Sequence, residues 1–427
     1  MTALAQADLP RDIAIAGCGI GGLALATLLK RAGLKPVLFD RLDAPKPVGS
    51  GLILQPVGLS VLNAMGLADD IVGRSARIDR LFGRSGADGP VVLDVRYSAL
   101  AGKRYGLAVH RASLFDALYR AALADDVPIE TGRTIADVDI GADGRPALVF
   151  EDGRHSTRFD LVIDALGCFS PLRSPGRMLP FGALWASLDF NDPGPFDGHA
   201  LEQRYERARK MVGVLPIGSL SGQSMPMTAF FWSLKQDAYD TWRATSLNAW
   251  KAEVIALWPE TEALLGQIAN HDDLVMARYV HHTEPHPVKG RLVHLGDSYH
   301  ATSPQLGQGA NTALLDAWAL ATALTERTGP LDARLQVYPR LRWRHVWLYQ
   351  AASHLFTPVY QSDSAVLPFI RDRIMGPLSR IPPAPQILAS LVSGLLTRPV
   401  ETLGLEEAYP DAFADRDAVS THRIAAE

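Results

Sequence analysis

A glycine-rich segment near the start of the chain is the first stretch that could do chemistry. Residues 13–22 read IAIAGCGIGG, so Gly17, Gly19 and Gly22 fit the pattern GxGxxG. In this pattern the first glycine permits a tight turn, the second lets a pyrophosphate approach the backbone, and the third lets helix and strand pack closely. The free N–H groups of the following helix then face the anion. The segment therefore predicts a dinucleotide-binding turn.

A carboxylate follows at the distance that such a turn requires. The sequence predicts a strand at 12–16, a helix at 22–32 and a second strand at 36–40, which together make a βαβ unit of a parallel sheet. Asp40 ends the second strand about 20 residues after Gly17, where its carboxylate can bind both hydroxyls of a ribose. This unit alone does not distinguish NAD from FAD.

A second segment lies in the last third of the chain. Residues 294–320 read HLGDSYHATSPQLGQGANTALLDAWAL, which places Gly296 and Asp297 at the end of a strand and lets residues 307–309 open a helix. Together with FDR at 39–41 and HRASLFDAL in the middle of the chain, these motifs resemble the FAD-dependent aromatic hydroxylases of the para-hydroxybenzoate hydroxylase type, the single-component flavoprotein monooxygenases.

The resemblance implies a bound FAD and assigns residues to it. Asp297 would accept a hydrogen bond from a ribityl hydroxyl, and Arg111 would contact the phosphate and ribityl region. A helix starting at about 309 would point its N–H groups at the pyrimidine edge of the ring, where the reduced flavin carries negative charge. The full set of cofactor-binding residues that the resemblance implies is Gly17, Gly19, Gly22, Asp40, Arg41, Arg111, Asp297, Pro304, Gly307, Gln308, Gly309, Ala310 and Asn311.

The segment 160–173, DLVIDALGCFSPLR, departs from the family pattern, which reads roughly D-x-x-I-G-A-D-G-x-x-S-x-V-R. Asp164 stands where glycine is expected, and Leu166 stands where the family has an aspartate associated with FAD and the nicotinamide donor. A leucine side chain cannot accept a hydrogen bond, so Leu166 weakens the expectation of NADPH or NADH as electron donor. In one hypothesis Leu166 only packs, and Asp164 supplies a displaced carboxylate. In the other, electrons come from a partner such as a flavin reductase, or from the substrate.

The expected fold class is α/β, with a Rossmann-like FAD-binding domain, an inserted antiparallel-sheet substrate domain and a C-terminal helical region. The antiparallel strands are predicted from alternating segments such as 183–190, 210–218 and 227–235. The predicted divisions are 1–177 for the first part of the FAD-binding domain, 178–285 for the substrate-binding sheet domain, 286–330 for the returning part of the FAD-binding domain, and 331–427 for the helical region.

The substrate site is less specified. The resemblance places the substrate between the flavin and the inner face of the middle sheet. Met227 and Phe231 share one face of a predicted strand, opposite Phe230, and these two with Tyr205 are the candidate substrate residues. The sequence nominates no catalytic residue. It contains no Ser/His/Asp arrangement and no Cys/His cluster with metal-ligand spacing, so no metal site is expected.

The resemblance also implies a reaction. Reduced FAD would add O₂ at its C4a carbon, and the resulting hydroperoxide would insert one oxygen atom into an aromatic or polycyclic small molecule, so that the protein's main task is to exclude water. Two alternatives remain open. One is a flavin oxidase or dehydrogenase of the same fold, and the other is a flavin-binding protein without turnover.

Composition excludes some classes of partner. The net charge is −4, from 42 basic and 46 acidic residues, and no like-charge cluster could follow a phosphate backbone, so nucleic acid is not expected as a partner. The start of the chain lacks the pattern of a secretion signal, and the two cysteines fit a reducing cytoplasm. The apolar run ILASLVSGLL at 387–396 spans half of the ~20 residues of a membrane helix. It predicts a packed helix, with a surface-lying membrane helix as the alternative, and no membrane contact is expected.

Overall fold

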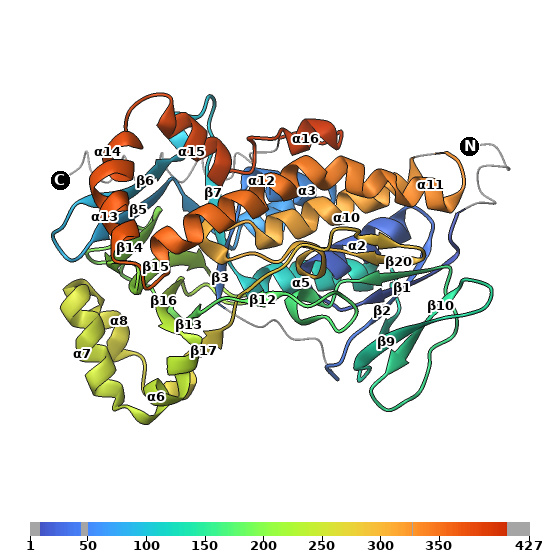
Figure 1. The fold of residues 1–427 in the computed structure, drawn as a ribbon, viewed down its shortest axis with the longest axis horizontal. Helices are drawn as coiled ribbons and strands as arrows, with labels where there is room; N and C mark the ends of the chain where they lie inside the picture. Colours follow the sequence, from blue (N-terminus) through green and yellow to red (C-terminus); the bar gives the residue numbers. More distant parts are fainter. Residues whose placement is uncertain (1–8, 44–49, 327, 408–427) are drawn as a thin grey trace.

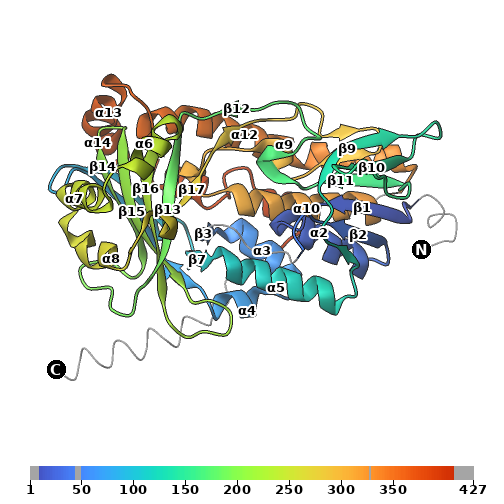
Figure 2. The ribbon, with the colours of Figure 1, turned by 90° about the horizontal axis from the view of Figure 1, so that it is seen from below.

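The computed structural model describes residues 9–43, 50–326 and 328–407. Figures 1 and 2 show an elongated molecule, with a parallel sheet towards one end and a larger antiparallel sheet towards the other. Helices α10 (Gly309–Thr325) and α12 (Val337–Tyr360) run along the long axis beside both sheets. This arrangement confirms the predicted α/β class and the helical C-terminal region. Within the described residues, we find no helix with the length and apolar character needed to cross a bilayer.

The parallel sheet contains the predicted βαβ unit. Its strand order is β19-β20-β11-β1-β2-β8, and β1 pairs in parallel with both β2 and β11. Helix α2 (Ile20–Arg31) connects β1 to β2. The segment 160–173, which departs from the family pattern and is called the altered segment below, contains β11. Strand β11 pairs with β20, the strand before Gly296. The bounds are β1 Asp12–Ala16, β2 Lys35–Phe39, β8 Ile129–Glu130, β11 Leu161–Asp164, β19 Val288–Lys289 and β20 Leu292–His294.

The larger sheet has seven strands in the order β17-β13-β16-β15-β14-β5-β6. Two of them, β5 and β6, come from within residues 1–177, and β5 pairs in parallel with β14. The seven-stranded sheet therefore includes strands from both sides of the predicted boundary at residue 178. The division of the chain into domains stays a prediction. The bounds are β5 Arg80–Ser85, β6 Val91–Arg96, β13 Phe181–Asp189, β14 Ala200–Glu206, β15 Lys210–Gly218, β16 Met227–Lys235 and β17 Val275–Ala277.

The remaining elements complete the layers around the two sheets. Three small sheets are formed by β3 (Gly51–Leu54), β7 (Gly106–His110) and β4 (Ala76–Ile78), by β9 (Ile135–Ile140) and β10 (Pro146–Phe150), and by β12 (Arg177–Met178) and β18 (Val280–His281). The other helices are α3 Pro56–Ala64, α4 Ala68–Val72, α5 Arg111–Ala124, α6 Tyr239–Ala244, α7 Leu247–Leu257, α8 Glu262–Gly266, α9 Asp297–His300, α11 Leu331–Leu335, α13 Val366–Ile370, α14 Gly376–Leu378, α15 Ala384–Val392 and α16 Pro399–Thr402.

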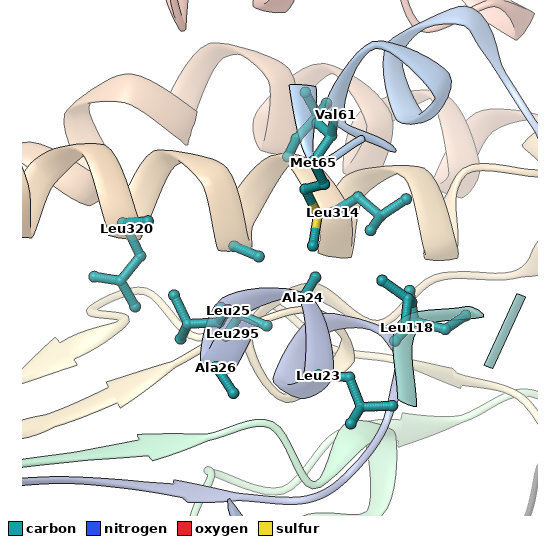
Figure 3. Packing of buried hydrophobic residues seen from close by; sticks show 14 of the residues in the cluster. Leu23, Ala24, Leu25, Ala26, Val61, Met65, Leu118, Leu295, Leu314 and Leu320 are labelled. Carbon is teal, nitrogen blue, oxygen red and sulfur yellow. The ribbon is translucent and has the colours of Figure 1, made fainter. Parts of the chain in front are cut away.

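The main core lies between α2 and α10. Figure 3 shows Ala24 and Leu25 of α2 facing Leu314 of α10, with Leu295 beside Leu25. These side chains belong to one buried apolar cluster. A Cβ atom at Gly21 would lie 3.4 Å from the Cβ of Ala313, so the two helices approach closely near their N-terminal ends. This packing brings the two glycine-rich segments, far apart in the sequence, to the same place.

A buried carboxylate on α10 fixes this helix against the turn at 296–300 and against α12. Asp316 Oδ2 accepts hydrogen bonds from the backbone N–H of Gly296 at 3.0 Å and from His300 Nε2 at 2.6 Å. Its Oδ1 accepts from Arg342 Nε of α12 at 2.6 Å. Burial alone would raise the pKa of Asp316, but the charges of His300 and Arg342 outweigh it and lower this pKa to about 2. His300 is therefore a packed, hydrogen-bonded residue of this turn.

We expect Asp316→Asn to destabilise the protein at neutral pH by about 3–5 kcal/mol, because Arg342 would remain buried without its counter-charge. In the wild type, the contribution of Asp316 is present above its unfolded pKa of about 4 and is lost as pH falls towards about 2. The variant should lack this part of the pH dependence. Urea unfolding between pH 7 and pH 2 measures both effects. Asp332→Asn, at an exposed ion pair, should change the unfolding free energy by about 0.5 kcal/mol or less, and an equally small loss in Asp316→Asn would contradict the assignment.

Candidate functional site

A cavity of about 620 Å³ lies where the two sheets and the C-terminal helices meet. One part, the cofactor half, is lined by residues 19–21, 165–169 and 301–310. The other part, the sheet half, is lined by strands of the seven-stranded sheet, by helices α12 and α15, and by the residues on either side of α14. The cavity therefore joins segments from the beginning, the middle and the end of the chain.

The first glycine turn has the geometry that a pyrophosphate requires. A Cβ at Gly17, where φ is +107°, would lie 2.6 Å from the carbonyl oxygen of Ala165, and a Cβ at Gly22 would lie 2.1 Å from that of Gly17. A Cβ at Gly19 would meet no described atom within 4 Å. The first and third glycines are thus required by backbone packing, whereas the second borders open space. No described side chain caps α2 and its first turn holds no acidic residue, so its N–H groups are available to an anion.

The start of α10 faces the same cavity. Residues 307–310 line it together with Pro304, and Gly307 takes the left-handed conformation, with φ +60° and ψ 29°. In the described chain, α10 also lacks a side-chain cap and an acidic residue in its first turn. Two uncapped helix N-termini therefore open onto one cavity. This arrangement suits an elongated ligand that carries negative charge at two places, as FAD does when it is reduced.

Asp297 and Arg111 supply the charged groups of the cofactor half. Both line the cavity. Burial raises the pKa of Asp297, and the nearby positive charges of His300 and Arg111 oppose that shift. Arg111 begins α5, and its backbone N–H donates to Ser50 O at 2.8 Å. A carboxyl and a guanidinium within one cavity can bind hydroxyl and phosphate groups.

Several expected cofactor residues lie beside the cavity instead of lining it. Gly17 and Gly22 shape the turn from behind, and Arg41 is exposed. Asp40 follows β2 directly, and its carboxylate accepts from the N–H of Cys18 at 2.9 Å and of Leu42 at 3.0 Å. Asp40 is therefore next to the turn, in the place expected of a ribose ligand, and its role stays a prediction.

Asn311 is one of the expected cofactor-binding residues, but the structure places its side chain away from the cavity. Its side chain is fully buried and does not line the cavity. The Oδ1 atom accepts from Gln55 N at 2.8 Å, and Nδ2 donates to the carbonyl oxygens of Ile53 and Gly307, each at 3.0 Å. The amide of Asn311 therefore ties α10 to β3. The sequence alone did not indicate that Asn311 links α10 to β3, because strand β3 was not predicted from it.

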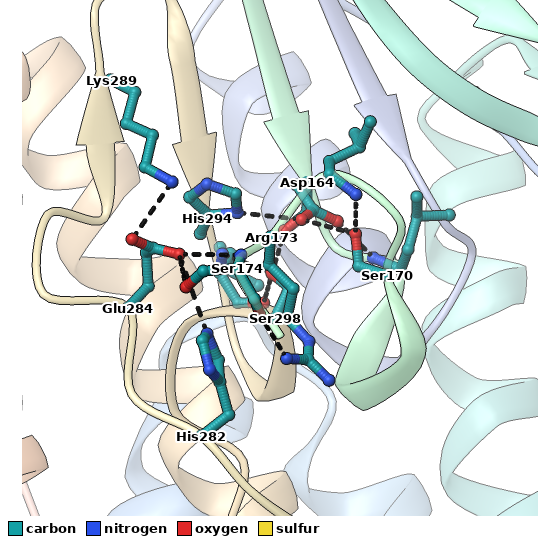
Figure 4. Close-up of polar contacts among 12 residues, drawn as sticks. Asp164, Ser170, Arg173, Ser174, His282, Glu284, Lys289, His294 and Ser298 are labelled. Atoms are coloured by element: carbon teal, nitrogen blue, oxygen red, sulfur yellow. Dashed lines mark hydrogen bonds and ion pairs between the residues drawn. The ribbon is translucent and has the colours of Figure 1, made fainter. Parts of the chain in front are cut away.

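The position of Asp164 contradicts the hypothesis that its carboxylate replaces the missing aspartate at the cofactor. Asp164 is fully buried, and its Oδ2 accepts from Ser170 Oγ at 2.7 Å and lies 2.9 Å from His294 Nδ1 (Figure 4). Its Oδ1 accepts from the N–H of Leu166 at 3.1 Å. Asp164 does not line the cavity, so it does not supply the displaced carboxylate. Leu166 does line it, with an apolar side chain.

Arg173 ends this segment, and it forms no ion pair with a carboxylate among the described residues. Its guanidinium donates to the carbonyl oxygens of Cys168 and Ser174. The nearby carboxylate, Glu284, accepts from Ser174 Oγ at 2.8 Å and pairs with Lys289 at 3.1 Å (Figure 4). Arg173 is thus held by main-chain oxygens, one of which belongs to Cys168, a residue that lines the cavity.

Aliphatic and aromatic side chains make up most of the sheet half. Tyr205 and Phe231 line it, whereas Met227 does not, so Met227 is not brought to the site. The ring centroids of Trp185 and Phe231 are 4.6 Å apart, and those of Tyr205 and Tyr360 are 5.3 Å apart. The Tyr205 hydroxyl donates to the side chain of Gln203 at 2.8 Å and is occupied. This wall fits a flat, mainly apolar ligand.

The C-terminal helices contribute a wall that the sequence analysis did not predict. Residues of α12 and α15, and the residues that flank α14, line the sheet half, among them Phe356, Tyr360, Met375 and Leu391. Their helical spacing looks the same whether a residue packs in a core or borders a cavity. The sequence therefore held no signal that could have separated the two cases.

Comparison with known proteins agrees with this geometry. The family described as FAD binding domain matches residues 11–352. The 3-amino-4-hydroxybenzoate 2-monooxygenase of Streptomyces cremeus is 30% identical over 356 residues, 77% of this chain and 82% of the relative. The 6-hydroxynicotinate 3-monooxygenase of Bordetella bronchiseptica is 27% identical over 359 residues, 80% of this chain and 90% of the relative.

Solved structures share the fold. Klebsiella pneumoniae HpxO complexed with FAD and uric acid superposes with a TM-score of 0.71 at 20% identity, over 90% of this chain and 98% of that one. Pseudomonas aeruginosa PqsL in complex with 2-aminobenzoylacetate also gives a TM-score of 0.71 at 20% identity, over 82% of this chain and 97% of that one.

Two glycine variants should separate packing from binding. Gly22→Ala should lower the unfolding free energy of the FAD-free protein by about 1–3 kcal/mol, because its Cβ would collide with Gly17 O. Gly19→Ala should leave that free energy nearly unchanged, since its backbone is extended and its Cβ meets open space. It should nevertheless weaken FAD binding about tenfold or more by blocking the approach of the pyrophosphate. Denaturant unfolding and flavin fluorescence titration measure the two effects. Unchanged FAD affinity in Gly19→Ala would refute the placement.

Proposed function

The chain belongs to the FAD binding domain family, and we propose that it is an FAD-dependent monooxygenase that inserts one oxygen atom from O₂ into a small aromatic molecule. The observation that carries the proposal is the single cavity whose cofactor half holds two free helix N-termini and whose sheet half is aromatic and apolar. The first half suits the cofactor, and the second suits a flat substrate beside it.

The relatives support the same reaction class. Those described above are named as monooxygenases of an aminohydroxybenzoate and of a hydroxynicotinate. An oxidase, a dehydrogenase or a flavin carrier without turnover is therefore not favoured. We also propose that the protein works in the cytoplasm, which is supported by its two free thiols, one of them buried.

The residues of the chain would divide the work as follows. FAD, when bound and reduced, supplies the activation of O₂ and the transfer of one oxygen atom to the substrate. The turn at Gly19, the carboxyl of Asp297 and the guanidinium of Arg111 would hold the cofactor. The N-terminus of α10 would favour negative charge on the bound ring. The aromatic wall around Trp185 and Phe231 would orient the substrate and exclude water.

The identity of the electron donor is less directly indicated by the site than the identity of the cofactor. Leu166 offers no hydrogen-bond acceptor in the cavity, and Arg173 binds main-chain oxygens. We propose NADH or NADPH as a weakly bound donor. Delivery by a flavin reductase is the second candidate, favoured by the same leucine.

Oxygen incorporation tests the reaction. The FAD-loaded protein, reduced in the presence of an aromatic candidate such as an aminohydroxybenzoate and then exposed to ¹⁸O₂, should give a product with one ¹⁸O atom. Two phenylalanine variants provide the control. Phe231→Leu opens the cavity wall and should divert turnover from product to H₂O₂, whereas Phe230→Leu, on the other face of β16 in a separate apolar cluster, should not. A product without ¹⁸O, formed with stoichiometric H₂O₂, would instead indicate an oxidase.

Restoring the missing acceptor tests the donor. We expect Leu166→Asp to speed reduction of the bound flavin by NADH or NADPH about tenfold or more, because the cavity wall would then offer a charged hydrogen-bond acceptor at this position. Leu166→Asn has similar volume without the charge and should give a smaller gain. Stopped-flow absorbance measures the rates. If neither nucleotide reduces the flavin in either protein, delivery by a partner becomes the better account.

A further inference from the structure

A short stretch after α12 combines an apolar exterior with a wall of the cavity. We define the C-terminal cap as residues 366–387, which include α13, a π-helical turn at Arg371–Met375, α14 and the start of α15. Figures 1 and 2 both place α13 and α14 at the outer edge of the molecule. Six large apolar side chains of the cap are between 49% and 64% exposed, namely Val366, Phe369, Ile374, Leu378, Ile381 and Ile387.

Each of these six side chains is exposed to solvent. Between them in the sequence, Pro368, Arg371 and Gly376 are buried. Met375 and Ser379 line the cavity on the inner side. The cap is therefore one layer thick, with the cavity on one side and an apolar exterior on the other. A helix on the surface of a globular protein usually turns polar side chains outward, and a gathering of large exposed apolar groups usually marks a binding surface.

The exposed charges of the cap have one sign. The cap contains four charged residues, and two of them, Arg373 and Arg380, are exposed. The only acidic one, Asp372, accepts from Arg371 Nε at 2.7 Å and from Ser85 Oγ at 2.8 Å, so its charge is neutralised within the fold. Arg380 Nη2 donates to the carbonyl oxygen of Val91 at 3.0 Å, which leaves its charge without an acidic partner among the described residues. The cap thus combines exposed aliphatic and aromatic groups with a net positive charge, although the whole chain has a net charge of −4.

We propose that the C-terminal cap docks on the surface of an anionic phospholipid membrane. Apolar side chains flanked by arginines are the combination that enters the boundary between headgroups and acyl chains, where the basic groups meet lipid phosphates. A two-fold contact with a second copy of the chain would instead bring like-charged arginines together. The protein would lie on the bilayer, and this replaces the expectation of no membrane contact.

The docked cap would place the sheet half of the cavity beside the lipid. Met375 and Ser379 of the cap, with Leu388 just beyond it, line that part of the cavity. An apolar substrate dissolved in the membrane could then reach the cavity past the cap. This consequence rests on the proposed function, whereas the docking itself does not.

Vesicle binding tests the proposal without requiring turnover. The FAD-loaded full chain is mixed with vesicles of phosphatidylcholine, alone or with phosphatidylglycerol, and the bound fraction is measured by sedimentation. We expect binding to the mixed vesicles that weakens when salt is added, because salt screens the arginines. Phe369→Glu with Ile381→Glu should reduce the binding about tenfold or more, since two apolar anchors are lost.

Two further variants sharpen the test. Leu123→Glu on α5 changes a side chain that is 49% exposed, the same fraction as Ile387, but lies outside the cap, and it should leave vesicle binding nearly unchanged. Arg373→Gln should weaken binding to the mixed vesicles about fivefold, with little effect on pure phosphatidylcholine. Flavin absorbance, together with thermal unfolding, confirms that each variant is folded and loaded.

Three results would overturn the proposal. The first is no binding of the wild type to the mixed vesicles. The second is equal loss of binding in Leu123→Glu and in the cap variants. The third is self-association in analytical ultracentrifugation that the cap variants abolish while vesicle binding is absent, because the cap would then be an interface between two copies. Failure of oxygen insertion with normal vesicle binding would count against the proposed function alone.

Discussion

The carboxylate of Asp316 is the interaction on which the rest of the site depends. It is fully buried and accepts hydrogen bonds from the backbone N–H of Gly296, the imidazole of His300 and the guanidinium of Arg342, so Asp316 on α10 joins the turn at 296–300 to α12. Because all of these groups are buried, no water can replace a missing partner, and the segments keep one arrangement. The turn at Gly296, the start of α10 and the long helix α12 therefore hold fixed positions around the cavity.

That fixed arrangement explains why two glycine-rich segments can share one ligand. The first turn is formed by β1 and α2, and the second is formed where β20 leads into α9 and α10. The parallel sheet joins them through β11, and the α2–α10 packing keeps their helices close. Each helix end alone would be a weak anion site. Two such helix ends on one cavity suit a long cofactor that carries negative charge at two places. The aromatic wall in the sheet half then leaves room for the substrate beside it.

The sequence predicted the parts of the fold that depend on local pattern. The βαβ unit, the strands of the middle sheet and the helix after residue 309 follow from hydrophobic periodicity and glycine spacing. It did not predict that β5 and β6 extend the middle sheet, because strand pairing over long distances leaves no local signal. The family resemblance implied Asn311 as a cofactor-binding residue, and one of two hypotheses gave Asp164 the role of a displaced carboxylate. Their actual partners, on β3 and β20, come from segments far away in the sequence.

The pairing of Asp164 with His294 constrains how this chain can evolve. The two residues occupy matching positions on neighbouring strands, and both are fully buried. A glycine at 164 would leave the imidazole without its acceptor, and an apolar residue at 294 would leave the carboxylate with fewer donors in a dry interior. Either change alone crosses a less stable intermediate. The free energies of the two residues are therefore coupled, so that replacing both with a matched apolar pair should cost less stability than the two single replacements together.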